Sequence, residues 1–154
     1  MSNGLSGPHL AAAFLCEKVL VERDGVMTFV RVVDRFVIPV FENLPAGVQV
    51  PTPIIQVTLF VSLKAGLLGT GKYKVSVKGN KPDGSEMPVN TQQVFFQGSE
   101  DMGANMGFQM ALQSPEEGLF WFDIYFEDAL LTRVPMRVLH QPAAIPYQAP
   151  GAAH

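Results

Sequence analysis

The chain has 154 residues, of which 47% are hydrophobic and only 16% are charged, and its net charge is −3. This length suits a single domain with a two-layer core. The negative charge disfavours nucleic acid as the main ligand, because binding a phosphate backbone needs a basic surface. Since cores hold few charges, the low charge must belong to the surface, and we expect a partner to cover part of it.

The ends of the chain differ from its middle. The apolar run Leu10–Cys16 has no Lys or Arg before it and stops at Glu17, so we interpret it as a strand, not as a signal or membrane segment. Cys16 is the only cysteine, which excludes an intrachain disulfide and fits a reducing compartment. We therefore predict a cytoplasmic protein without membrane contact. Its predicted parts are a flexible N-terminus (1–10), one domain (11–140) and a disordered tail rich in Pro and Ala (141–154).

Alternation of apolar and polar residues with a period of two, interrupted by Gly, Pro and Asp, dominates the domain. This pattern predicts an all-β fold, an antiparallel β-sandwich of the immunoglobulin-like or C2-like type. The Pro-bearing segment 39–53 is expected to cross between the two sheets. We predict about eight strands, at 11–21, 27–38, 54–63, 72–78, 89–96, 105–113, 119–127 and 131–139.

The first predicted hairpin turns at Arg23-Asp24-Gly25, where Gly25 suits a positive φ angle. Pairing outward from this turn places Glu17 opposite Arg31. Two interpretations of this acid–base pair stay open. A buried pair would cost about 3–5 kcal/mol if one partner were removed, and a pair at the rim, which we favour, would contribute less than about 1 kcal/mol.

The last predicted hairpin has one face for the core and one for a partner. The even-numbered residues from Phe120 to Phe126 point inward, so the opposite face carries an exposed set of aromatic and arginine side chains. These residue types are enriched at binding hot spots, and arginine stacks on aromatic rings. An ordinary outer sheet face is the simpler alternative. The predicted partner-binding residues are Trp121, Tyr125, Arg133 and Arg137.

Other motifs carry weaker signals. The segment Gly66–Tyr73 has the glycine and lysine spacing of a phosphate loop, but a strand follows it where a helix is required. The lysines between residues 72 and 81 could meet an anionic partner, although we favour protection of an edge strand. The acidic loop residues are too scattered for calcium. Cys16 and His140 are the only candidate nucleophile and base, and Cys16 lies in the middle of a predicted strand. We expect no metal and no cofactor.

Several segments resemble an uncharacterised bacterial family of short proteins. At the N-terminus these are Ala13–Leu20, Asp24-Gly25 and Arg31–Phe36, and the C-terminal hairpin adds Gly118–Asp123 and Thr132–Val138. The similarity extends from about Ala13 to Val138. The resemblance implies a cytosolic β-sandwich with a domain of unknown function, and it implies no activity, cofactor or site residue.

The sequence therefore favours a non-enzymatic domain that binds a protein partner or assembles with itself through the exposed aromatic and arginine face. One alternative is a module that binds a small ligand or carbohydrate at its loop ends. A second is a hydrolase with Cys16 as its nucleophile, which would require a thiol that reacts at neutral pH. No nucleic acid or membrane is expected as a partner.

Overall fold

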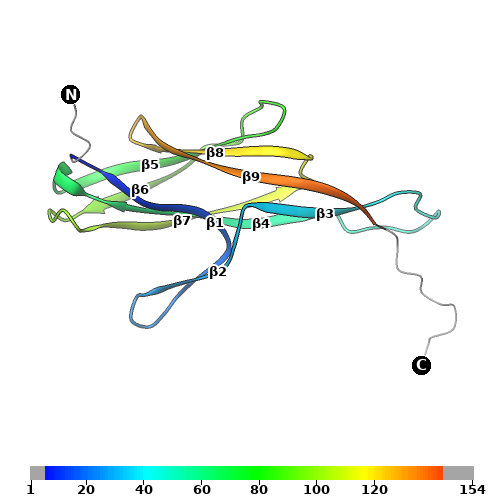
Figure 1. Cartoon of the computed structure of the whole chain (residues 1–154), viewed down its shortest axis with the longest axis horizontal. Helices are drawn as coiled ribbons and strands as arrows, with labels where there is room; N and C mark the ends of the chain where they lie inside the picture. The colour runs from blue at the N-terminus through cyan, green and yellow to red at the C-terminus, as the bar shows by residue number, and fades with distance from the viewer. Residues whose placement is uncertain (1–5, 144–154) are drawn as a thin grey trace.

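Strands with one apolar face must bury that face against another layer, and the computed structural model, which describes residues 6–143, shows two sheets that do so (Figure 1). The all-β prediction is confirmed, and a short 3-10 turn, η1 (Gly66–Leu68), interrupts the strand pattern. Residues 6–143 form nine strands: β1 (His9–Val21), β2 (Met27–Val33), β3 (Arg35–Phe41), β4 (Ile54–Lys64), β5 (Gly71–Asn80), β6 (Asn90–Phe96), β7 (Gly103–Gln113), β8 (Gly118–Phe126) and β9 (Ala129–Ala143).

The strands divide into sheet A, with the order β2-β1-β4-β7, and sheet B, with the order β3-β9-β8-β5-β6. Sheet B is curled into a half-barrel. Neighbours within the described residues are antiparallel except β3 and β9, which run parallel. The prediction of a purely antiparallel fold is therefore wrong at this pair. The immunoglobulin-like or C2-like type stays a prediction.

The segment 27–38, predicted as one strand, is two strands in different sheets. The chain pairs with β1 up to Val33, bends at Asp34, and continues as β3 beside β9 in sheet B. The first hairpin otherwise has the predicted register, with Leu15 opposite Val33, and Gly25 has a φ angle of 83°. Side-chain alternation is the same in one long strand as in two shorter ones, so the sequence pattern did not reveal the change of sheet.

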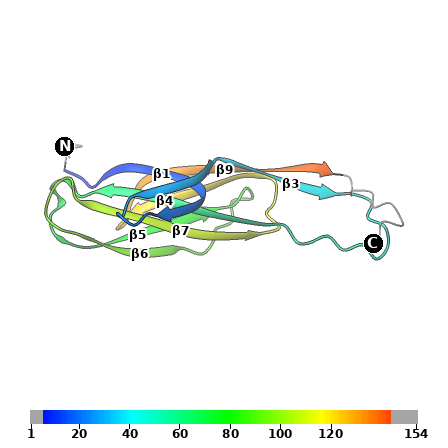
Figure 2. The ribbon, with the colours of Figure 1, turned by 90° about the horizontal axis from the view of Figure 1, so that it is seen from below.

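The connection between β3 and β4 crosses from sheet B to sheet A, as predicted for segment 39–53, although its first residues belong to β3. β3 and β9 extend together beyond the other strands, as Figures 1 and 2 both show. β9 continues to Ala143 and β1 begins at His9, so the regular structure is longer at both ends than the predicted domain. The rest of the predicted flexible N-terminus (1–5) and tail (144–154) lies outside the described residues.

One core fills the space between the sheets. Apolar residues of β4 and β7 are buried in it, and the predicted inward residues of β8, its even positions, bury four side chains in a row. Burial of large apolar side chains is the main stabilising contribution to such a fold. No helix within residues 6–143 is long and apolar enough to cross a membrane. The largest fully buried side chains of the core are Phe96, Phe108, Phe120, Phe122, Leu15, Leu59, Leu63 and Ile124.

Candidate functional site

The outer face of sheet B, the face turned away from the core, holds all four predicted partner-binding residues. Strands β8 and β9 are neighbours, with Trp121 opposite Pro135 and Asp123 opposite Arg133. Tyr125 follows on the same face of β8, and Arg137 lies opposite Leu119. The predicted inward and outward sets are thus confirmed for this hairpin, because the strand pairing preserves the alternation along both strands.

Arg133 holds Trp121 and Asp123 in one arrangement. The guanidinium carbon of Arg133 lies 4.7 Å from the centre of the Trp121 ring, a cation–π contact. Its Nε donates a hydrogen bond of 2.7 Å to Oδ1 of Asp123, whose side chain is only 13% exposed. Asn80 Nδ2 donates a further hydrogen bond of 3.1 Å to Oδ2 of Asp123. Both carboxylate oxygens are therefore bonded, so the Trp121 and Arg133 side chains are held in place before any partner arrives.

Arg137 has an arginine neighbour that the sequence interpretation missed. In the parallel pairing of β3 and β9, Arg35 lies beside Arg137, and both are exposed. Arg35 forms an ion pair of 3.3 Å with Asp34, whereas Arg137 has no carboxylate within ion-pair distance among residues 6–143. The sequence pattern places Arg35 in the first hairpin, as part of the predicted strand 27–38. Its position on this face follows only from the parallel pairing of β3 with β9.

Two irregularities shape the same hairpin. The register of β8 and β9 shifts between Ile124 and Tyr125, which places Tyr125 opposite Leu130, and such a bulge redirects the nearby side chains. Pro135 lacks a backbone N–H, which favours a position at a sheet edge or bulge. β9 lies inside sheet B, but its pairing with β3 begins only at Arg137, whose backbone N–H donates to the Asp34 carbonyl. Proline is therefore tolerated where β9 has no β3 partner to receive an N–H.

The lysine stripe, formed by Lys72, Lys74 and Lys78 of β5, lies on this outer face, and the explanation expected for it is wrong. The stripe was attributed to an edge strand, yet β5 lies between β8 and β6. The register places Lys78 opposite Asp123, with Lys74 and Lys72 following on the same face. Lys78 also forms a 2.6 Å ion pair with Glu86, which raises the pKa of the Lys78 ammonium. A strand with neighbours on both sides needs no protection against edge pairing.

The predicted ion pair of Glu17 and Arg31 forms on the surface, away from this face. The distance from Arg31 Nη1 to Glu17 Oε1 is 3.2 Å, and the two side chains are 74% and 34% exposed, respectively. The rim interpretation of the pair is therefore confirmed. Arg31 has a φ angle of 50°, so the strand bends there. The turn of this hairpin, between β1 and β2, projects from the body of the molecule in Figure 1.

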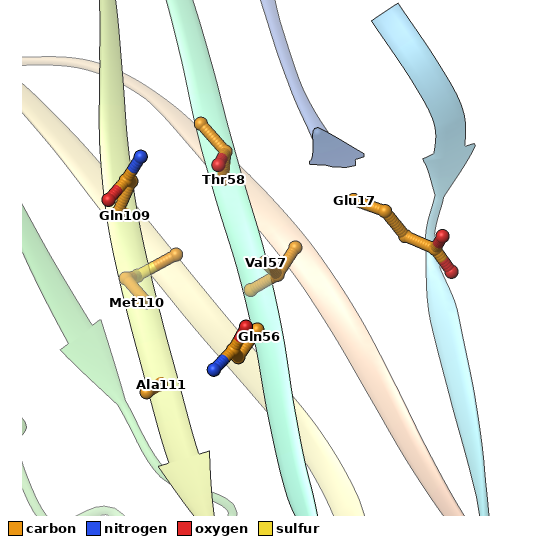
Figure 3. Close-up of a pocket in the computed structure, with 7 residues that line it drawn as sticks. All are labelled: Glu17, Gln56, Val57, Thr58, Gln109, Met110 and Ala111. Carbon is orange, nitrogen blue, oxygen red and sulfur yellow. The ribbon is translucent and has the colours of Figure 1, made fainter. Parts of the chain in front are cut away.

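A second candidate region lies on the outer face of sheet A. An open pocket of about 320 Å³ is lined by the polar side chains of Gln56, Thr58 and Gln109, with Glu17 at its border. Figure 3 shows Gln56 and Thr58 on β4, Gln109 on β7, and Glu17 across β4 on the side opposite β7. Its donors and acceptors suit a neutral polar ligand. The pocket lies on the sheet, not at the loop ends where a ligand was expected.

Cys16 and His140, the candidate nucleophile and base, lie in different sheets. Cys16 is fully buried, and burial raises the pKa of its thiol, which disfavours the nucleophilic thiolate. His140 lies in the other sheet, with its Nε2 2.9 Å from the carbonyl oxygen of Pro115. The segment after the glycine-rich stretch is a strand, as predicted. Within residues 6–143 no cluster of three His, Cys, Asp or Glu side chains is arranged to hold a metal.

Taken together, the fold and this outer face define a two-sheet, all-β domain with a cationic and aromatic surface. The chain belongs to a family of unknown function (DUF6941), whose model matches residues 11–139. No curated protein matches the chain with significant similarity. The resemblance to an uncharacterised family is thus confirmed, while bacterial origin and cytosolic location stay predictions.

Proposed function

We propose that this protein is a non-enzymatic binding or assembly domain that recognises a protein partner through the outer face of sheet B. The observation that carries the proposal is the ordered group formed by Trp121, Arg133 and Asp123. A tryptophan and an arginine held by fixed neighbours lose little side-chain entropy on binding. Arg35, Tyr125 and Arg137 extend the same face, so one partner surface could contact all of them.

The proposal also covers location and self-association. The single cysteine of the chain, Cys16, is buried and unpaired, which suits a cytoplasmic protein. A low fraction of charged residues favours a covered surface, and a second copy of the chain is one candidate to cover it. Sedimentation over a wide range of concentrations would separate self-assembly from binding to another protein.

The test compares variants of the face in affinity capture from the source cell. Arg137→Glu and Tyr125→Ala each change one side chain of the face, and the double variant Trp121→Ala with Arg133→Ala removes its ordered centre. Lys18→Glu, an exposed change on β1, is the matched control. We expect a partner that the wild type and control capture to be lost with the face variants. Equal capture by every variant that melts like the wild type would reject the proposal.

A second candidate is a module that binds a small polar ligand, favoured by the pocket in Figure 3. Gln56 and Gln109 present amide groups that can both donate and accept hydrogen bonds, as sugar hydroxyls require. The aromatic rings of Phe14, Phe29 and Phe60 cluster on the same sheet, with centroids 4.5–5.3 Å apart. A sugar panel measured against the wild type and Gln56→Ala would test this, and binding unaffected by the substitution would reject it.

A further inference from the structure

Positive charge is concentrated on the outer face of sheet B. Of the 11 Lys and Arg residues, six project from its strands, whereas Asp123 is the only carboxylate that projects there among the 14 Asp and Glu residues. Four more carboxylates, from Asp34, Glu86, Glu117 and Glu127, border it. The six cationic residues are Arg35, Lys72, Lys74, Lys78, Arg133 and Arg137.

Six cations against five carboxylates leave this face at +1, so the remainder of a chain of net charge −3 carries −4. The separation was invisible in the overall charge. It arises because the parallel pair brings Arg35 beside Arg137, and because β5 lies next to β8. Because β5 is not an edge strand, its lysines continue the cationic surface that begins at the arginines.

The cationic residues form a strip along the strands. Its length follows from the strand pairing. Along the strand direction, the position of Arg137 and Leu119 is ten residues away from that of Lys72, which corresponds to about 33 Å. Apolar side chains accompany the charges, among them Trp121, Leu119 and Phe95, and Phe95 is opposite Lys72 and half exposed. A ligand that matches the strip therefore needs negative charges with apolar groups between them.

We propose that the partner of this face is an acidic polypeptide segment, which lies along the strip from Arg35 and Arg137 to Lys72. The inference rests on the proposed function and adds the chemistry of the partner. Carboxylates of the segment would pair with Arg137, which has no ion-pair partner among residues 6–143, and with Lys74 and Lys72. Its apolar side chains would pack near Trp121, where Arg133 and Asp123 already neutralise each other.

A polypeptide fits better than nucleic acid or an anionic membrane. Binding a nucleic acid requires an uninterrupted basic surface that neutralises many phosphates. Here Asp123 lies in the middle of the strip and Glu86 beside Lys78, so a phosphate backbone would meet fixed negative charge. In an extended peptide every second side chain faces the strip. A segment whose facing side chains are carboxylates near Arg137, Lys74 and Lys72 and apolar near Trp121 therefore avoids these two positions.

The experiment is a nuclear magnetic resonance titration of the full chain. The probe is a synthetic peptide about ten residues long, the length of the strip. Every second residue faces the strip and is Glu at both ends and Val in the middle, and the residues between them are Thr. Its lysine counterpart, an oligo-thymidine and phosphatidylserine vesicles are the comparison ligands. We expect the acidic peptide to shift amide signals of β3, β5, β8 and β9 selectively, and to bind at least about fivefold more weakly when salt rises from about 50 to about 200 mM.

Two charge-reversed triple variants complete the test. Arg35→Glu with Lys74→Glu and Arg137→Glu should weaken binding of the acidic peptide by about tenfold or more. The control has the same change in net charge on exposed residues elsewhere, Arg23→Glu with Lys18→Glu and Lys64→Glu, and should bind within about twofold of the wild type.

Equal losses in both triple variants, shifts spread over sheet A, no shifts at all, or tighter binding of the oligo-thymidine or vesicles would each overturn the inference. The capture experiment described above keeps the two proposals distinguishable. If the face variants abolish capture while the acidic peptide fails, only the acidic chemistry is rejected. If the face variants leave capture unchanged, the proposed function itself is rejected.

Discussion

Neighbouring residues on β9 offer a direct test of which face of sheet B is buried. Met136 has no exposed surface and lies opposite Phe120 in the core. Met136→Ala removes three heavy atoms of a buried side chain. At about 0.8 kcal/mol for each buried methylene-sized group, this loses roughly 2.4 kcal/mol before any cavity is counted. Adding a partly relaxed cavity brings the expected loss in free energy of unfolding to about 3–4 kcal/mol.

Arg137→Ala, one residue along the same strand, is the matched control. Arg137 is exposed on the outer face and its backbone N–H keeps its bond to Asp34 in the variant. We expect this change to alter the free energy of unfolding by less than about 0.5 kcal/mol. Urea unfolding followed by the fluorescence of Trp121, the only tryptophan, measures both variants, with midpoints compared at a common m value.

The opposite ranking would refute the reasoning. A loss below about 1 kcal/mol for Met136→Ala, together with a larger loss for Arg137→Ala, would mean that the outer face is the buried one. The partner-binding face would then be misassigned, and the proposals that place a partner on the outer face of sheet B would be refuted.

Three further predictions concern other parts of the molecule. Glu17→Gln should lower the free energy of unfolding by less than about 1 kcal/mol because its pair with Arg31 is exposed; a loss of about 3 kcal/mol in urea unfolding would instead indicate a buried pair. Cys16 should resist alkylation at neutral pH in the folded protein and react in denaturing urea, as mass spectrometry would show, because burial raises the pKa of its thiol. The Cys16 thiol loses its proton at a lower pH in the unfolded chain than in the folded protein. The free energy of unfolding should therefore fall as pH rises above the ordinary thiol range, and Cys16→Ala should abolish that fall. Gly103→Ala should destabilise the protein by about 1–3 kcal/mol in the same unfolding assay, because an added Cβ would overlap the carbonyl oxygen of Leu63; an unchanged midpoint would contradict this packing.

Much of the candidate site could be predicted from the sequence. The direction of a side chain along a strand depends only on its own backbone, so alternation alone placed Trp121, Tyr125, Arg133 and Arg137 on one face and Phe122 on the other. The turn at Gly25 was equally local, since its positive φ angle follows from the chemistry of glycine. From this turn the register followed residue by residue to the pair of Glu17 and Arg31.

Strand order was decided only by tertiary structure. Whether β3 continues sheet A or joins sheet B depends on contacts with β9, a strand far away in the sequence, and the alternation of Phe36 and Ile38 fits both arrangements. The same long-range pairing set Arg35 beside Arg137 and placed β5 between two neighbours. Side-chain alternation is a local property of the chain, whereas the choice of a neighbouring strand minimises the free energy of the whole molecule, so the charge of this face emerged only when the sheets were assembled.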